Sequence, residues 1–268
     1  MFIDTHCHLN IMIKDTFDTP LQQADYELAK SIIADASAHG TEILINVGTS
    51  LIESLNCIEL AKRFEKNYAV IGIHPNDITD AWRTELKELN ALAAQKETLK
   101  IVGIGECGMD FHYPDYKVQL QKDVFRAQIE LALKHDLALV VHTRDARDET
   151  LQVIEEYHKE IKRGIIHCFS EDQDFANQVM AWGFAIGLGG TITYPKNSYL
   201  RDIAIAAPLS SIVLETDAPY LPPQVLRGKK NTPANIPLIG EFLAGLKGVP
   251  VEQVMEETTR TARSIFQI

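Results

Sequence analysis

Short apolar runs alternate along this chain with longer amphipathic stretches. Most of the runs are continuously hydrophobic, which is typical of strands that are buried on both faces of a parallel sheet. The runs are Phe2–Ile3, Ile43–Val47, Tyr68–Ile73, Ile101–Ile104, Leu137–Val141, Gly164–Ile166, Phe184–Leu188 and Ile212–Leu214. The first and the sixth are short for strands. The pattern therefore predicts up to eight buried parallel strands.

The amphipathic stretches between the runs have the spacing of helices. They are Leu21–His39, Leu51–Lys66, Trp82–Gln95, Val118–His135, Ala146–Lys162, Asp174–Trp182, Leu200–Ala207, and Ile236 to the C-terminus in two pieces. Gly248-Val249-Pro250 separates the last two pieces. Strands that alternate with helices in this way predict a TIM-like (β/α)8 barrel, and 268 residues suit one such domain over 1–268. A doubly wound open sheet is the alternative, but no glycine-rich fingerprint follows the first strand.

Polar residues follow most of the predicted strands. In a (β/α)8 barrel the chemistry lies at the C-terminal ends of the strands. Five of the nine histidines are found there, accompanied by two carboxylates; the seven residues are His6, His8, His74, Glu106, His142, His167 and Asp217. A single histidine on a strand is usually a packing residue, but so many at one rim indicate a metal site. Imidazole and carboxylate ligands suit Zn²⁺, Mn²⁺ or Fe, and added carboxylate and water suit Mg²⁺.

Strand geometry refines this prediction, because side chains alternate between the two faces of a strand. His6 and His8 should point together into the barrel mouth, with Asp4 on the same face to orient a ligand from behind. Glu215 and Asp217 should likewise share a face, and Glu215 is a candidate partner of a histidine ligand. The cysteines next to proposed ligands should point outward and pack rather than bind metal; these are Cys7, Cys107 and Cys168.

Composition narrows the classes of protein. Hydrophobic residues make up 46% and charged residues 24%, as in ordinary globular domains. No run approaches the roughly 20 apolar residues of a membrane span, and no export signal is recognisable at the N-terminus, so we expect a cytoplasmic protein. The net charge of −11 argues against gripping a long duplex through many phosphate contacts. It leaves room for an enzyme that takes one strand end into a cationic metal site.

Seven segments in order carry a family resemblance. They are Asp4-Thr5-His6-Cys7-His8-Leu9, Gly72-Ile73-His74-Pro75, Gly103-Ile104-Gly105-Glu106-Cys107-Gly108-Met109-Asp110, His142-Thr143-Arg144-Asp145-Ala146, His167-Cys168-Phe169-Ser170, Glu215-Thr216-Asp217-Ala218-Pro219-Tyr220-Leu221 and Arg227-Gly228-Lys229-Lys230-Asn231. Nearly end to end, the chain resembles the TatD family of metal-dependent deoxyribonucleases, within the amidohydrolase-like superfamily. Glu171-Asp172 stands where that family commonly has Gly, and Thr232 where Glu is usual.

The resemblance implies a centre of two divalent metal ions, Mg²⁺, Mn²⁺ or Zn²⁺. One ion would be held by His6, His8 and Asp217, the other by His142 and His167, with Glu106 bridging the two. It also implies a magnesium-dependent DNase, often a 3′–5′ exonuclease, whose partner is DNA, especially single strands or 3′ ends. Asp217 is then the candidate general base, and Glu106 belongs with it to the catalytic centre.

Four further residues are candidates for binding substrate phosphate: His74, Arg144, Arg227 and Lys229. A solvated loop is the alternative interpretation of Arg227 and Lys229, and a structural role beside Pro75 is the alternative for His74. Two rival functions stay open. The same centre could serve a small-molecule hydrolase acting on a lactone, amide or phosphoester, or the fold could belong to a binding protein without activity.

Overall fold

The computed structural model describes residues 1–14 and 16–268, and its eight parallel strands form one sheet in sequence order. The strands are β1 (Phe2–Cys7), β2 (Thr41–Val47), β3 (Asn67–Ile71), β4 (Ile101–Asp110), β5 (Ala138–Arg144), β6 (Gly164–Ile166), β7 (Phe184–Leu188) and β8 (Ile212–Leu214). Every predicted apolar run lies wholly or largely within one of them. The sheet curls into the predicted (β/α)8 barrel.

The first and last strands meet where the barrel closes. Cys7 forms a parallel bridge with Ala218, just beyond β8. The backbone N–H of Asp217 donates to the carbonyl of His6 (2.9 Å), and the N–H of His8 donates to the carbonyl of Ala218 (2.8 Å). The closure therefore sets Asp217 directly beside the two histidines of the first strand.

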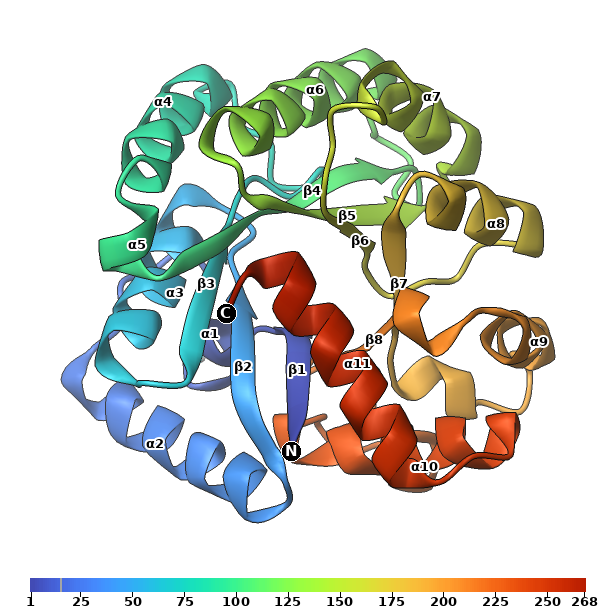
Figure 1. Ribbon diagram of the computed structural model, residues 1–268. Coiled ribbons are helices and arrows are strands. Elements are labelled where there is room, and N and C mark those ends of the chain that lie inside the picture. Colours follow the sequence, from blue (N-terminus) through green and yellow to red (C-terminus); the bar gives the residue numbers. More distant parts are fainter. Residues whose placement is uncertain (15) are drawn as a thin grey trace.

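Helices surround the barrel on the outside, and Figure 1 shows α11 lying across the end at which both chain termini are found. The α-helices are α1 (Leu9–Met12), α2 (Gln23–Ala38), α3 (Leu51–Arg63), α4 (Trp82–Ala93), α5 (Lys96–Leu99), α6 (Val118–His135), α7 (Arg147–Tyr157), α8 (Gln173–Ala181), α9 (Ser198–Ala206), α10 (Ile236–Lys247) and α11 (Val251–Phe266). Short 3₁₀ turns are η1 (Gly190–Thr193), η2 (Leu209–Ser211), η3 (Gln224–Leu226) and η4 (Pro233–Asn235). Polar side chains begin some helices as expected, since Ser50 caps α3 and Asp172 caps α8.

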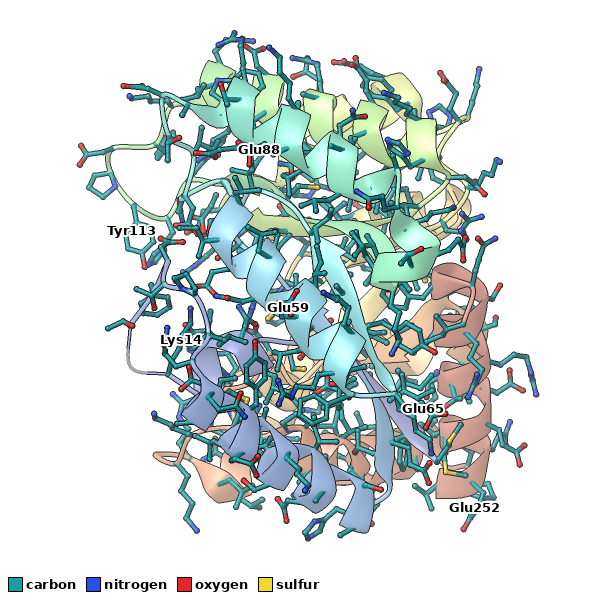
Figure 2. All side chains as sticks on the ribbon, turned by 90° about the vertical axis from the view of Figure 1, so that its left-hand side faces the viewer. Lys14, Glu59, Glu65, Glu88, Tyr113 and Glu252 are labelled. Atoms are coloured by element: carbon teal, nitrogen blue, oxygen red, sulfur yellow. The ribbon has the colours of Figure 1, made fainter. Side chains whose placement is uncertain are left out.

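The barrel interior is filled by branched and small apolar side chains from every strand. This buried cluster also contains three residues of α11, which plug the end where the strands begin: Ala262, Ile265 and Phe266. The opposite end is therefore the open one. In Figure 2 the labelled Lys14, which follows β1, and Tyr113, which follows β4, lie at that end, away from α11. No helix in the described chain is long and apolar enough to cross a membrane.

Several strands end at residues other than the last residue of the apolar run that predicted them. Strand β4 continues six residues beyond Ile104 to Asp110, so Glu106 lies inside it. Strand β3 stops at Ile71, so His74 lies in the segment after it. The physical reason is that polar residues can continue a strand when its neighbours pair with it, and β5 pairs with β4 through Asp110.

Candidate metal centre

The six residues predicted to bind metal meet at the open end of the barrel. His6 lies in β1 and His8 just after it, whereas Glu106 lies in β4 and His142 in β5. His167 directly follows β6, and Asp217 is the third residue after β8. The side chains are largely inaccessible to solvent, with relative exposures from 1% for His6 to 16% for His142. Residues far apart in sequence are thus brought into one small volume, as the sequence predicted.

Glu106 lies at the middle of this group, between two pairs of histidines. Its Oε2 is 3.3 Å from Nε2 of His6 and 3.7 Å from Nε2 of His8. Its Oε1 is 2.8 Å from Nδ1 of His142 and 3.6 Å from Nε2 of His167. Each oxygen therefore faces one pair of imidazoles, and the Glu106 carboxylate lies between the two pairs.

Asp217 closes the group from the side of β8. Its Oδ1 lies 3.4 Å from Nε2 of His8, 4.0 Å from Nε2 of His6 and 3.9 Å from Nε2 of His167. The residue adopts a positive φ of 55°, which turns the chain sharply after the last strand. This carboxylate consequently faces both halves of the group.

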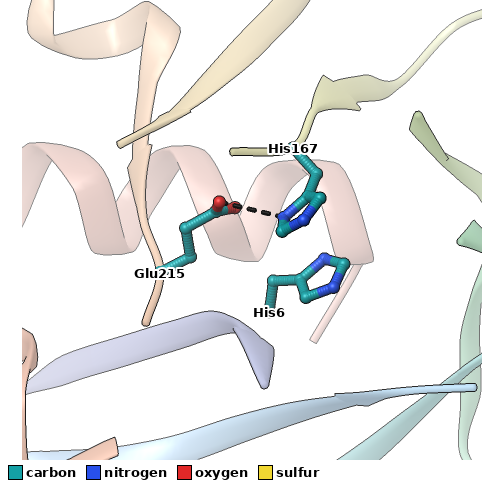
Figure 3. A group of neighbouring side chains, drawn as sticks. All are labelled: His6, His167 and Glu215. Carbon is teal, nitrogen blue, oxygen red and sulfur yellow. Dashed lines mark ion pairs between the residues drawn. The ribbon is translucent and has the colours of Figure 1, made fainter. Parts of the chain in front are cut away.

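The histidine rings are held from behind. Nδ1 of His167 lies 2.9 Å from Oε1 of Glu215, the contact drawn in Figure 3, and Nδ1 of His8 lies 2.9 Å from the carbonyl of Val47. Figure 3 also shows the ring of His6 lying over that of His167, with centroids 3.4 Å apart. A partner on one ring nitrogen fixes the orientation and the tautomer, so the other nitrogen can face a metal. Glu215 thus stands where the sequence predicted a histidine partner.

The electrostatics of the group favour cations. Burial alone would raise the pKa of Glu106, but the imidazoles of His167 and His6 hold it well below its usual range. Burial lowers the pKa of His167, yet Glu215, Glu106 and Asp217 raise it to about 10. The carboxylates that raise the pKa of His167 also attract cations. Two sets within the group of six, His6/His8/Glu106 and Glu106/His142/His167, bring ligand atoms within 4.8 Å of one another. The nitrogen and oxygen donors fit a divalent metal.

Comparison with known proteins supplies the family. The TatD related DNase family matches residues 3–267. This chain belongs to that family.

One relative of this TatD-family protein is the uncharacterized metal-dependent hydrolase YabD of Bacillus subtilis (strain 168). The two chains are 32% identical over 268 residues, which cover 100% of each. The 3′-5′ ssDNA/RNA exonuclease TatD of Salmonella typhimurium is 29% identical over 260 residues, covering 94% of this chain and 99% of that protein. The crystal structure of YJJV, a TatD homologue from Escherichia coli K12, matches with a TM-score of 0.88 and 28% identity, over 100% of this chain and 98% of that one. Family and metal-binding clusters together make the chain a metal-dependent hydrolase.

The sequence predictions for Asp4 and Cys168 have different outcomes. Asp4 does contact a proposed ligand, but through the backbone: its carboxylate accepts hydrogen bonds from the N–H of His6 and from the hydroxyl and N–H of Thr216. It therefore also ties β1 to the segment after β8. The prediction for Cys168 is wrong. Cys168 does not point outward, because β6 ends at Ile166 and Cys168 has a positive φ of 45°. Its sulfur lies within 4.8 Å of ligand atoms of His167 and Asp217.

The other two cysteines beside proposed ligands, Cys7 and Cys107, are fully buried among apolar side chains. They pack as the alternation of strand residues predicted.

His74 lies at the edge of the centre. Its Nε2 is 3.8 Å from Oε1 of Glu106, while its Nδ1 accepts a hydrogen bond from the N–H of Asn76. Burial and the nearby His142 lower the pKa of His74 to about 3, so the ring is neutral. With Nδ1 accepting, the proton is on Nε2, which makes His74 a hydrogen-bond donor to the centre. His74 also forms, with Asp110 and His142, one of the sets whose ligand atoms lie within 4.8 Å of one another.

The three predicted basic residues lie at the same end of the barrel but outside the group of six. Arg144 is exposed at the last position of β5. Arg227 and Lys229 are exposed in the segment after β8, and the Arg227 guanidinium lies 4.5 Å from the ring centroid of Tyr194. Within residues 1–14 and 16–268, none of the three forms an ion pair with a proposed ligand.

Asp110 is a site residue that the sequence reasoning missed. Its Oδ2 lies 3.0 Å from Nε2 of His142, opposite the nitrogen that faces Glu106. The predicted strand ended at Ile104, which left Asp110 in a loop. Continuing the strand would have revealed it, because positions 106, 108 and 110 then share one face.

Proposed function

We propose that this TatD-family hydrolase is a 3′–5′ exonuclease that removes nucleotides from single-stranded DNA ends, using two divalent ions (Mg²⁺, Mn²⁺ or Zn²⁺). The observation that carries the proposal is the position of Glu106 between the pair His6 and His8 and the pair His142 and His167. Two-metal centres of this kind serve phosphodiester cleavage in many nucleases. The name of the Salmonella typhimurium relative, a 3′-5′ ssDNA/RNA exonuclease, supports the same choice of substrate.

Each residue has a role in this proposal. His6, His8 and Asp217 would hold one ion, His142 and His167 the other, and Glu106 would touch both. Bound divalent ions would supply Lewis-acid polarisation of the phosphodiester and a lower pKa for a coordinated water. The surrounding buried partners, above all Glu215 and Val47, keep the imidazoles oriented. This pre-organisation spares the site a rearrangement during the reaction.

Asp217 is the group proposed to take the proton from the attacking water. Burial would raise the pKa of this carboxyl, but His8, His167 and His6 lower it, so Asp217 is ionised at neutral pH and can accept a proton. Neutral His74 presents its Nε2–H to the same space and would donate to a phosphate oxygen without adding a buried charge. Arg144, Arg227 and Lys229 would neutralise phosphates farther along the strand.

The charge of the chain supports a single-stranded end over a long duplex. The net charge of −11 leaves little attraction for the many phosphates that a duplex-binding face contacts. The reactive group is confined to the mouth of the barrel, where one strand end can enter.

The test is an incubation of the protein with 3′-labelled and 5′-labelled single-stranded DNA, in Mg²⁺, Mn²⁺, Zn²⁺ or chelator. We expect mononucleotides to be released stepwise from the 3′ end, only when metal is present. Asp123→Asn, on the exposed side of α6, serves as a control for the preparation and should retain the wild-type rate. If no strand is cleaved in any metal while a lactone, amide or small phosphoester is hydrolysed, the small-molecule hydrolase is the correct function.

A further inference from the structure

The exposed aromatic side chains of the described residues all follow the C-terminal ends of strands. Their exposures range from 42% to 60%, and they are Phe17, Tyr113, Tyr116, Tyr199 and Tyr220. Phe17 comes after β1, Tyr113 and Tyr116 after β4, Tyr199 after β7 and Tyr220 after β8. Exposed aliphatic residues show no such preference: Leu55 lies on α3 and Ile205 in the last turn of α9. The aromatic side chains therefore gather at the end that holds the metal centre.

Three of these tyrosines are linked by contacts to the mouth itself. The Tyr220 ring centroid lies 6.0 Å from that of His8. The hydroxyl of Tyr199 donates to the carbonyl of Ser170 (3.0 Å), three residues beyond His167. The Tyr113 ring lies 5.3 Å from that of His112, whose Nδ1 is 3.0 Å from Asp145 after β5. We call Tyr113, Tyr199 and Tyr220 the aromatic rim.

Beyond the proposed contacts of Arg144, Arg227 and Lys229, charge gives little attraction for a strand held there. Phosphate contacts give affinity in proportion to the number of cations, and this chain carries a net charge of −11. Exposed aromatic rings bind unpaired bases by stacking, which needs no charge and tolerates any sequence because every base has a π-face. Paired bases inside a duplex offer no such face to a side chain.

We propose that the aromatic rim stacks the unpaired bases of a single-stranded nucleic acid whose end lies at the metal centre. This inference rests on the proposed nuclease function and adds to it the residues that select single strands. Tyr113, Tyr199 and Tyr220 lie after different strands, so the bases of one strand spread over the mouth can meet more than one ring. Selection for single strands then arises from stacking, with little dependence on base identity.

The experiment measures binding by fluorescence anisotropy in Mg²⁺. The probes are a fluorescein-labelled thymidine strand with phosphorothioate linkages and an abasic strand of the same length. The variants are Tyr113→Leu and Tyr199→Leu, with Tyr113→Phe and Tyr199→Phe as conservative partners. Ile205→Ala is the matched control, because Ile205 is 50% exposed on the same helix as Tyr199 but in its last turn.

We expect the wild-type protein to bind the thymidine strand more tightly than the abasic strand. Each leucine variant should weaken binding of the thymidine strand roughly tenfold and leave the abasic strand unaffected, since a stacked base contributes about that much. The phenylalanine variants and Ile205→Ala should bind as the wild type does. Equal affinity for the two probes, or leucine variants that bind as tightly as the wild type, would overturn the inference.

Failure of this inference is distinguishable from failure of the proposed function. If the wild-type protein releases nucleotides stepwise and the leucine variants bind with unchanged affinity, the nuclease function is supported and the aromatic rim is contradicted. If the leucine variants lose base-dependent binding and the wild-type protein cleaves no strand in any metal, the aromatic rim is supported and the nuclease function is contradicted.

Discussion

Oδ2 of Asp110 lies 3.0 Å from Nε2 of His142, and the other nitrogen of that ring lies 2.8 Å from Glu106. Asp110 is itself fixed by the N–H of His112 (2.9 Å) and the side-chain amide of Asn76 (3.0 Å). Burial would raise the pKa of Asp110, but the bond to His142 and the other two lower it to about 2. The ring is thus held by an ionised carboxylate whose position is determined by two further bonds.

Asp110→Asn should therefore weaken metal binding at the His142 side of the centre. An amide in place of the carboxylate removes the charge that orients the ring, and losses behind metal ligands cost roughly 10- to 100-fold in affinity. Isothermal titration of Mn²⁺ into metal-free protein measures the change directly. Asp123→Asn, an exposed carboxylate on α6, should titrate as the wild type. An Asp110→Asn protein with unchanged affinity would show that Asp110 does not position His142.

A second prediction concerns Gly187, which makes room for Glu215. A Cβ at Gly187 would lie 2.3 Å from Oε2 of Glu215, closer than real side chains approach. Gly187→Ala should displace Glu215 from His167 and weaken metal binding on that side. Gly245→Ala on α10 is the control, because no heavy atom lies within 4 Å of its added Cβ.

The double variant Gly187→Ala/Glu215→Ala makes this prediction specific. If Gly187→Ala acts by moving Glu215, it should add little metal-binding loss once Glu215 is already gone, because the two changes remove the same contact. Additive losses in the Mn²⁺ titration would mean that the alanine disturbs the barrel in some other way.

Much of the fold and most of the centre could be predicted from the sequence, for one physical reason. Parallel strands are apolar on both faces, so the eight runs are visible, and a barrel gathers whatever follows them. His142 and His167 could be placed together in this way, although one lies in β5 and the other directly follows β6. The sequence did not predict side-chain directions that depend on a local backbone angle. Cys168 turns toward the centre through a positive φ, and the apolar pattern carries no sign of that angle.

Partners behind the ligands were harder to predict because they depend on contacts between elements. Asp4 accepts a hydrogen bond from the backbone N–H of His6, and its other carboxylate oxygen accepts one from the hydroxyl of Thr216 across the barrel closure. The sequence did not indicate Asp110, because the end of β4 is paired with β5 and therefore needs no apolar residues. Tertiary pairing, rather than local pattern, determines both positions.

A third prediction follows from the position of Asp217. Asp217→Asn keeps one oxygen for a metal but cannot accept a proton, so turnover should be abolished while the fold is retained. Release of labelled nucleotides from single-stranded DNA measures turnover, and circular dichroism with a thermal melt reports the fold. A variant that cleaves DNA at the wild-type rate would mean that another group accepts the proton.

A fourth prediction concerns the segment after β1, which is anchored by a buried ion pair. Nζ of Lys14 lies 2.7 Å from Oε1 of Glu53, with side-chain exposures of only 6% and 1%. Glu53 also accepts hydrogen bonds from the amides of Asn10 and Asn56 and from the N–H of Asp18. Removing one partner of a buried pair leaves the other charge unpaired, so Glu53→Gln should lower the free energy of unfolding by about 3 kcal/mol at pH 7.

This contribution of Glu53 should depend on pH in a defined direction. Burial alone would raise its pKa, but the bonds from Lys14, Asn10 and Asn56 lower it below the ordinary value of 4.5. A carboxyl whose pKa is lower in the folded state stabilises the protein fully above about pH 4.5, and this stabilisation is lost as the pH falls through the folded-state value. Urea unfolding at a series of pH values should therefore show the wild type and Glu53→Gln converging in acid. Glu59→Gln, which removes an exposed partner of Lys62 on the same helix, should differ little from the wild type at any pH. A gap between wild type and Glu53→Gln that stays constant down to acid pH would show that the lost stability comes from packing and not from the ionised carboxylate.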